Sequence, residues 1–137
     1  MSRSQGRVLA FQAVYAWEAA KTPVNDLCEF EWEEAKKLKK FTDADFVFAK
    51  LLIAGTIENI DSIDQKIILQ LRNWDFSRLK RVDLAILRIS VYALVFQKDV
   101  PATVVIGEAV KLCIEFGTDD SYKFVNGVLD NIKKTLA

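Results

Sequence analysis

The stretch that decides the fold is RVDLAILRISVYALVFQKDVP, residues 81–101. Between Leu84 and Phe96 its only charge is Arg88, and apolar residues lie on nearly every side of a helical wheel. A helix that is apolar all round must be surrounded by other elements, so we expect it to be the buried axis of the domain, with a carboxylate partner for Arg88. Only about a dozen residues are uninterrupted where a membrane span needs ~20, which favours a core helix.

The composition outside this stretch indicates an all-α protein. A chain of 137 residues is typical of one domain, so we expect residues 1–137 to form a single compact unit. The sequence is 51% apolar and 28% charged, with only five glycines and two prolines, too few for a β protein with many turns.

Several kinds of chemistry are disfavoured by the residues present. The chain has no histidine, and no glycine-rich phosphate loop or nucleophile–base pair can be assembled. Cys28 and Cys113 are far apart and lack the CxxC spacing of a metal or redox site. Lys plus Arg and Asp plus Glu are 19 each, so a nucleic acid would have to meet a local patch. We therefore predict no enzyme activity, metal or cofactor, and a reduced, cytoplasmic protein without a membrane partner or export signal.

The hydrophobic spacing predicts five further helical segments, which gives about six to seven helices in all. Thr42 and Asp45 form a cap pattern, and Gly117 is expected to end a helix in a left-handed conformation. Gly127 lies inside the last helix, where we expect close approach by another backbone. The segments span residues 4–20, 25–40, 42–71 with a bend near 59–62, 104–116 and 122–134.

One side of the first helix mixes charged and apolar residues, because Arg3, Arg7, Phe11, Val14 and Glu18 share it. A solvated face would make Phe11 and Val14 unusual, whereas a face that meets another helix would hold the arginines at its edge with their charges in water. We favour the second arrangement. If Phe11 and Val14 were exposed instead, they would be a candidate homodimer face.

Three motifs and the opening of the chain carry a resemblance to a known family. The motifs are RVDLAILR (81–88), Val100-Pro101 followed by GEAVKL (107–112), and FGTDDSYKFVNGVLD (116–130), and the opening is SRSQGRVLAFQAVYAWE (2–18). Together they closely resemble the NusB family of bacterial transcription antitermination factors. The resemblance implies an all-helical fold of two small three-helix-like bundles packed together. Residues 22–75 share only the helical pattern.

The resemblance also implies a function and its partners. A NusB-like protein would bind the single-stranded boxA element of nascent RNA jointly with NusE, which is also a small-subunit ribosomal protein. With RNA polymerase and other Nus factors, it would promote reading through terminators in rRNA operons. Matched position by position, the implied RNA-binding residues are Arg3, Arg7, Tyr15, Asp83, Asp120, Lys123 and Phe124.

Physical chemistry supports this division of roles, because basic groups attract phosphates and aromatic rings stack on unpaired bases. Other roles stay open for three residues: Phe124 fits an apolar core stripe, Asp120 fits a helix N-cap, and Tyr15 fits packing. Ser4 and Gln5 stand where further arginines are common in the family, so RNA binding by the chain alone should be weak and salt-sensitive. Ala93 and Gly107 also depart from the family pattern.

Three alternative functions compete with an antitermination factor. The chain could be a helical RNA-binding module related to the one fused to rRNA cytosine methyltransferases, although an end at Ala137 leaves no room for a catalytic domain. It could be a helix-turn-helix around Gly117, which the neutral charge disfavours. A purely structural helical scaffold is the third alternative.

Overall fold

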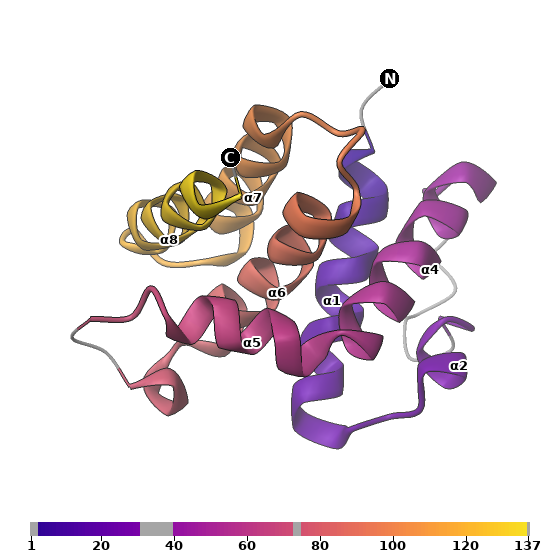
Figure 1. Ribbon diagram of the computed structural model, residues 1–137. Helices are drawn as coiled ribbons and strands as arrows, with labels where there is room; N and C mark the ends of the chain where they lie inside the picture. Colours follow the sequence, from indigo (N-terminus) through magenta and orange to yellow (C-terminus); the bar gives the residue numbers. More distant parts are fainter. Residues whose placement is uncertain (1–2, 31–39, 73–74, 137) are drawn as a thin grey trace.

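The computed structural model describes residues 3–30, 40–72 and 75–136, and every regular element in these ranges is a helix (Figure 1). The prediction of an all-α fold with six to seven helices is confirmed for this part of the chain. In chain order the elements are α1 (Ser4–Ala20), α2 (Val24–Leu27), α4 (Asp43–Glu58), α5 (Ile60–Ile68), the short 3-10 helix η1 (Phe76–Arg78), α6 (Arg81–Phe96), α7 (Ala102–Phe116) and α8 (Ser121–Thr135).

Helix α6 is the buried axis that its sequence predicts. Eleven of its 16 residues are buried. Helices α7 and α8 pack against it on one side, and α1 and α4 on the other (Figure 1). Two small groups of helices therefore share α6, as expected for two bundles packed together. None of the helices in the described ranges is long and apolar enough to cross a membrane.

The predicted helix over 42–71 begins and bends as expected. Thr42 and Asp45 form a capping box, in which the Thr42 hydroxyl accepts from the Asp45 amide at 3.1 Å and the Asp45 carboxylate accepts from the Thr42 amide at 2.9 Å. The bend falls at Asn59, where α4 ends and α5 begins. The side-chain amide of Asn59 donates to the carbonyl of Gly55 at 2.8 Å and so satisfies one acceptor at the end of α4.

Two local predictions are wrong. Gly117 has an extended backbone with φ −95°, not a left-handed one, and it is needed for space: a Cβ there would lie 2.8 Å from the Cys113 carbonyl oxygen. The second helix was expected over 25–40, but α2 ends at Leu27 and Phe30 has φ 58°. The remainder of that prediction, over residues 31–39, lies outside the described residues.

The mixed face of α1 meets other helices of the same chain. Phe11 and Val14 are 4% and 0% exposed, so the prediction of a helix-facing side is confirmed, and these two residues offer no exposed face for a homodimer. Arg7 is also buried, at 7% exposed, which contradicts its expected place at the edge. It lies inside because Glu108 and the ring of Phe48 accompany its guanidinium.

The last prediction corrected by the fold concerns Gly127, because no atom lies within 4 Å of the Cβ that an alanine would carry. We expect Gly127→Ala to raise the free energy of unfolding by about 0.5–1 kcal/mol, since alanine restricts the unfolded chain and favours helix. Chemical denaturation of both proteins measures this difference. Gly55→Ala is the matched contrast: its Cβ would meet the ring of Tyr92, so overpacking should cost about 1–3 kcal/mol. Equal effects of the two substitutions would contradict this account.

Candidate functional site

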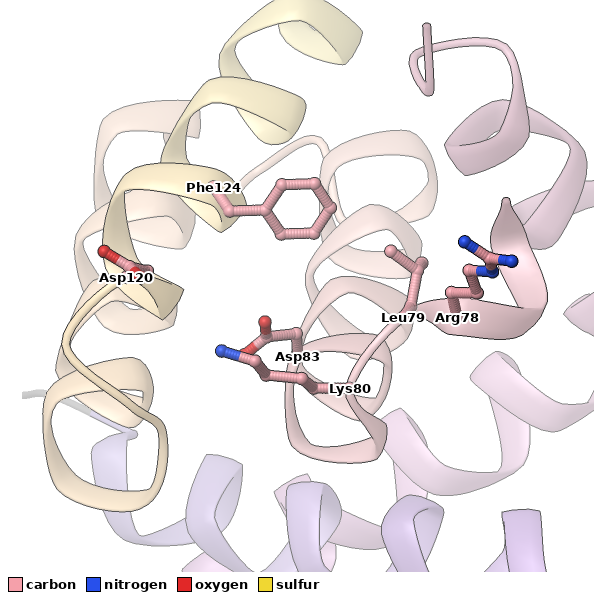
Figure 2. Close-up of a pocket in the computed structure, with 6 residues that line it drawn as sticks. All are labelled: Arg78, Leu79, Lys80, Asp83, Asp120 and Phe124. Carbon is pink, nitrogen blue, oxygen red and sulfur yellow. The ribbon is translucent and has the colours of Figure 1, made fainter. Parts of the chain in front are cut away.

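A cavity of about 270 Å³ lies where the start of α6 faces the start of α8. Residues 78–80 and the first turn of α6 form one side of the cavity, and the start of α8 forms the other (Figure 2). Three of the seven residues predicted to bind RNA, Asp83, Asp120 and Phe124, are therefore brought together from α6 and α8. The lining residues are Arg78, Leu79, Lys80, Asp83, Asp120 and Phe124.

The segment before α6 is held in shape by local hydrogen bonds. The carboxylate of Asp75 accepts from the Ser77 amide at 3.1 Å and caps η1. Leu79 and Lys80 are extended, and Leu79 packs against the core. This extended step carries the chain from η1 into α6 and leaves the Lys80 side chain over the cavity (Figure 2).

Lys80 joins the two sides of the cavity. Its ammonium group donates to the hydroxyl of Thr118 at 2.7 Å, across 38 positions of the chain. The Thr118 amide in turn donates to the Ser121 hydroxyl at 3.0 Å, which fixes the turn between α7 and α8. Asp120 occupies the N-cap position of α8, but its side chain makes no capping hydrogen bond. Its carboxylate is therefore not used by the helix end, and the capping role predicted for it is not realised.

Asp83 lies at the base of the cavity, in the first turn of α6, and is only 4% exposed. Cys113 is fully buried close by, and burial together with the negative charge of Asp83 raises the pKa of its thiol to about 12. A thiol with so high a pKa stays protonated and unreactive. Cys113 therefore serves as a packing residue, and Asp83 supplies the negative charge at this point of the cavity.

Arg88 joins α6 to three other elements of the fold. Its guanidinium donates to both carboxylate oxygens of Asp64, at 2.9 and 2.8 Å, and also pairs with Glu18. The predicted carboxylate partner is thus confirmed, with one acid from α5 and another from α1. The same guanidinium lies 5.9 Å from the centre of the Phe76 ring in η1. One buried cation therefore ties α1, α5 and η1 to α6 and positions the segment that lines the cavity.

The comparison with known families decides what kind of protein carries this cavity. The model of the NusB family matches residues 4–134. The chain belongs to the NusB family. The match includes every element described above except the last residue of α8, so the resemblance of the three sequence motifs extends to nearly the whole chain.

Members of the NusB family are similar to this chain over nearly their full lengths. The transcription antitermination protein NusB of Treponema denticola is 50% identical over 133 residues, which cover 97% of this chain and 96% of that protein. Among solved structures, NusB of T. maritima has a TM-score of 0.84 and 34% identity, with 98% of this chain and 92% of that one covered. A chain in the crystal structure of antitermination factors NusB and NusE with dsRNA has a TM-score of 0.83, 28% identity, and coverage of 97% and 96%.

Of the other site residues predicted from the NusB resemblance, Lys123 adjoins the cavity and Tyr15 lies on α1, outside its lining. Lys123 is exposed and lines a second depression, of about 460 Å³, that shares Asp120 with the cavity. Tyr15 is 41% exposed on α1, with its ring centre 6.2 Å from that of Phe11. Phe11 in turn lies 4.9 Å from the ring of Phe116, directly before the turn between α7 and α8. Tyr15 is thus connected through Phe11 to the last residue of α7.

The two predicted arginines lie at the start of α1, beside the middle of α7. Arg7 is 4.0 Å from the Glu108 carboxylate and 5.0 Å from the centre of the Phe48 ring, and burial lowers its pKa although Glu108 raises it in part. Arg3 is half-buried at the N-cap of α1. Ser4 donates to Glu108 at 2.8 Å. These arginines do not line the cavity, so they form a separate group from the residues of α6 and α8.

The prediction missed three lining residues, Arg78, Leu79 and Lys80. A signal for one of them was present in the sequence. Lys80 and Arg81 stand at the N-cap and first position of α6, where positive charge opposes the helix dipole. Such an arrangement is mildly unfavourable for the helix and suited to an anionic partner, whereas nothing in the sequence marks Leu79.

Proposed function

We propose that this chain is a non-enzymatic transcription antitermination factor that binds single-stranded RNA of the boxA type together with NusE. In this proposal it acts in the cytoplasm, where it joins RNA polymerase and other Nus factors and helps transcription of rRNA operons pass terminators. The shared name of the antitermination relatives and the NusB–NusE–RNA structure among the neighbours support the proposal.

The observation that carries the proposal is the convergence of an aromatic ring, two carboxylates and two basic side chains at one cavity. Phe124 offers a stacking surface for an unpaired base, and Asp83 and Asp120 offer acceptors for the donors on a base edge. Arg78 and Lys80 supply positive charge for the phosphates on either side of that base. This set of groups suits a splayed-out single strand better than a rigid duplex.

The remaining predicted residues extend the proposed path of the RNA beyond the cavity. Lys123 adds an exposed positive charge on α8, and Tyr15 offers a second exposed ring on α1. Arg3 would meet phosphates farther along the strand. Arg7 would also bind a phosphate, but only if that phosphate displaced Glu108 from its guanidinium. We therefore expect Arg7 to contribute less to RNA affinity than the exposed cations.

The test is fluorescence anisotropy with a labelled boxA-like single strand at fixed salt, with and without NusE. We expect the chain and NusE together to bind at least about tenfold more tightly than either alone, since the chain itself presents few cations to the phosphates. Raising the salt should weaken the binding. Equal affinity with and without NusE would contradict joint recognition, and tighter binding to duplex DNA would contradict an RNA function.

A further inference from the structure

Helix α4 carries apolar side chains on its solvent side as well as on its buried side. Leu52 and Ile53 are buried in the core, yet Val47 and Leu51, one helical turn apart, are 60% and 59% exposed. A helix at the surface normally presents polar residues on the side that faces away from the core. Neither exposed residue lines the cavity between α6 and α8, so the function proposed above gives no reason for them.

The exposed side of α4 borders a groove of about 540 Å³. Its lining includes Cys28 of α2, Leu51 of α4 and Tyr92 of α6. Phe96 extends the apolar surface beyond the groove, because its ring is 47% exposed and is stacked on Tyr92 with 5.1 Å between the ring centres. A continuous exposed apolar surface of this kind marks a site of interaction with another macromolecule.

Two opposite charges line the same groove at equal distances from a small residue. Lys50 and Glu58 are both exposed, and Ala54 lies midway between them on α4. Each charge is therefore one turn, about 6 Å along the helix axis, from Ala54. Neither forms an ion pair with another residue in the described part of the chain. The fold thus leaves both charges available to a partner.

We propose that this face binds the same face of a second copy of the chain, with the two α4 helices antiparallel and crossing at Ala54. A two-fold axis at Ala54 brings Lys50 of each copy opposite Glu58 of the other, because the two positions are equally far from the axis. An interface between identical faces must match itself, and this arrangement forms two ion pairs at once. The small side chain of Ala54 lets the helices approach, so that Leu51 of each copy packs against the other helix.

The proposed interface lies away from the cavity. Figure 1 shows α2 and α4 on one side of the molecule and α8 on the opposite side. A dimer formed through α4 would therefore leave the cavity at the start of α8 open in both copies. Self-association and RNA binding can accordingly be tested independently, and either proposal can fail without the other.

The experiment is sedimentation equilibrium of the full chain at concentrations from about 1 µM to about 1 mM, the range expected for an interface below the standard size. We expect the mean mass to rise from that of one chain to that of two. Lys50→Glu and Glu58→Lys, taken singly, each place like charges opposite each other twice and should weaken the dimer about tenfold or more. An equimolar mixture of these two variants restores both ion pairs and should dimerise like the wild type.

The matched control is Lys133→Glu, which reverses an exposed charge on α8 and should leave self-association unchanged. Leu51→Glu should abolish the dimer, because it puts a charge into the apolar contact. Circular dichroism checks that each variant is folded. Should a charge variant fail to fold, the wild type still tests the ion pairs, since added salt should weaken the dimer.

Three results would overturn the proposal. The first is a wild-type chain that stays monomeric at every concentration; if Leu51→Glu then also lost binding to NusE, the face would belong to that partner instead. The second is a mixture of Lys50→Glu and Glu58→Lys that associates no better than either variant alone, since the two charges would then not meet. The third is a folded Leu51→Glu protein that dimerises as tightly as the wild type, which would assign the dimer to another face.

Discussion

Replacing Arg88 with alanine is expected to lower the free energy of unfolding by about 3 kcal/mol, because it leaves two carboxylates facing each other without their shared cation. The Arg88 side chain is 4% exposed, whereas those of Asp64 and Glu18 are 18% and 29% exposed. The guanidinium also lies 5.6 Å from the centre of the Trp17 ring, so the substitution removes packing together with charge. Denaturant unfolding of both proteins, followed by far-UV circular dichroism, measures the loss.

The matched control is an ion pair in solvent. Lys134 pairs with Asp130 one helical turn away, and their side chains are 71% and 44% exposed. Lys134→Ala should cost below about 0.5 kcal/mol, since exposed pairs are screened by water and salt. A cost for Arg88→Ala as small as that of the control would mean that the buried network does not hold the helices together.

The same network gives the stability a dependence on pH. Burial alone would raise the pKa of Glu18, but hydrogen bonds and charge from Arg88, with help from Lys21, outweigh burial and lower that pKa below 4.5. A carboxyl whose pKa is lower in the folded state stabilises the fold above its unfolded pKa. That contribution is lost as the pH falls from about 4.5 through the folded pKa. Stability measured across this range should therefore fall less steeply for Arg88→Ala than for the wild type.

The features that could be predicted from the sequence are those set by residues close together in the chain, or those that have only one stable place in a fold. An apolar helix such as α6 has one stable place, the centre of the fold, and a buried arginine in it needs an acid. The capping box of Thr42 and Asp45 involves residues three apart, so its hydrogen bonds are encoded within one turn. These predictions did not depend on how distant segments pack.

The wrong predictions concern residues whose surroundings are formed by segments far away in the sequence. The sequence cannot tell whether a glycine provides a left-handed turn, room for a neighbour or neither, and Gly117 and Gly127 differ in this respect. Arg7 was expected in water because nothing in its neighbourhood along the chain announces Glu108, which lies about a hundred residues away. Lys80 joins the cavity through Thr118, and this contact too exists only once α6 and the turn before α8 have met.

Replacing Phe124 with alanine is expected to weaken RNA binding by the complex with NusE about tenfold or more, because stacking of a base on an aromatic ring contributes ~1–3 kcal/mol. Phe124 is half-buried and packs against the core, so alanine also removes some apolar contact within the fold. The melting temperature of the variant must therefore be measured beside the affinity. Binding is to be compared only at temperatures where both proteins are folded.

Phe96 provides the matched control for this substitution. It is a phenylalanine at the opposite end of α6 from the cavity, 47% exposed, and its ring centre lies 5.1 Å from that of Tyr92. Phe96→Ala should leave RNA affinity unchanged, since Phe96 does not line the cavity. A loss that is equal in the two variants would attribute the effect to general loosening of the helices. A loss confined to Phe124→Ala, with oligouridine and boxA-like strands both affected, would place a stacked base at the start of α8.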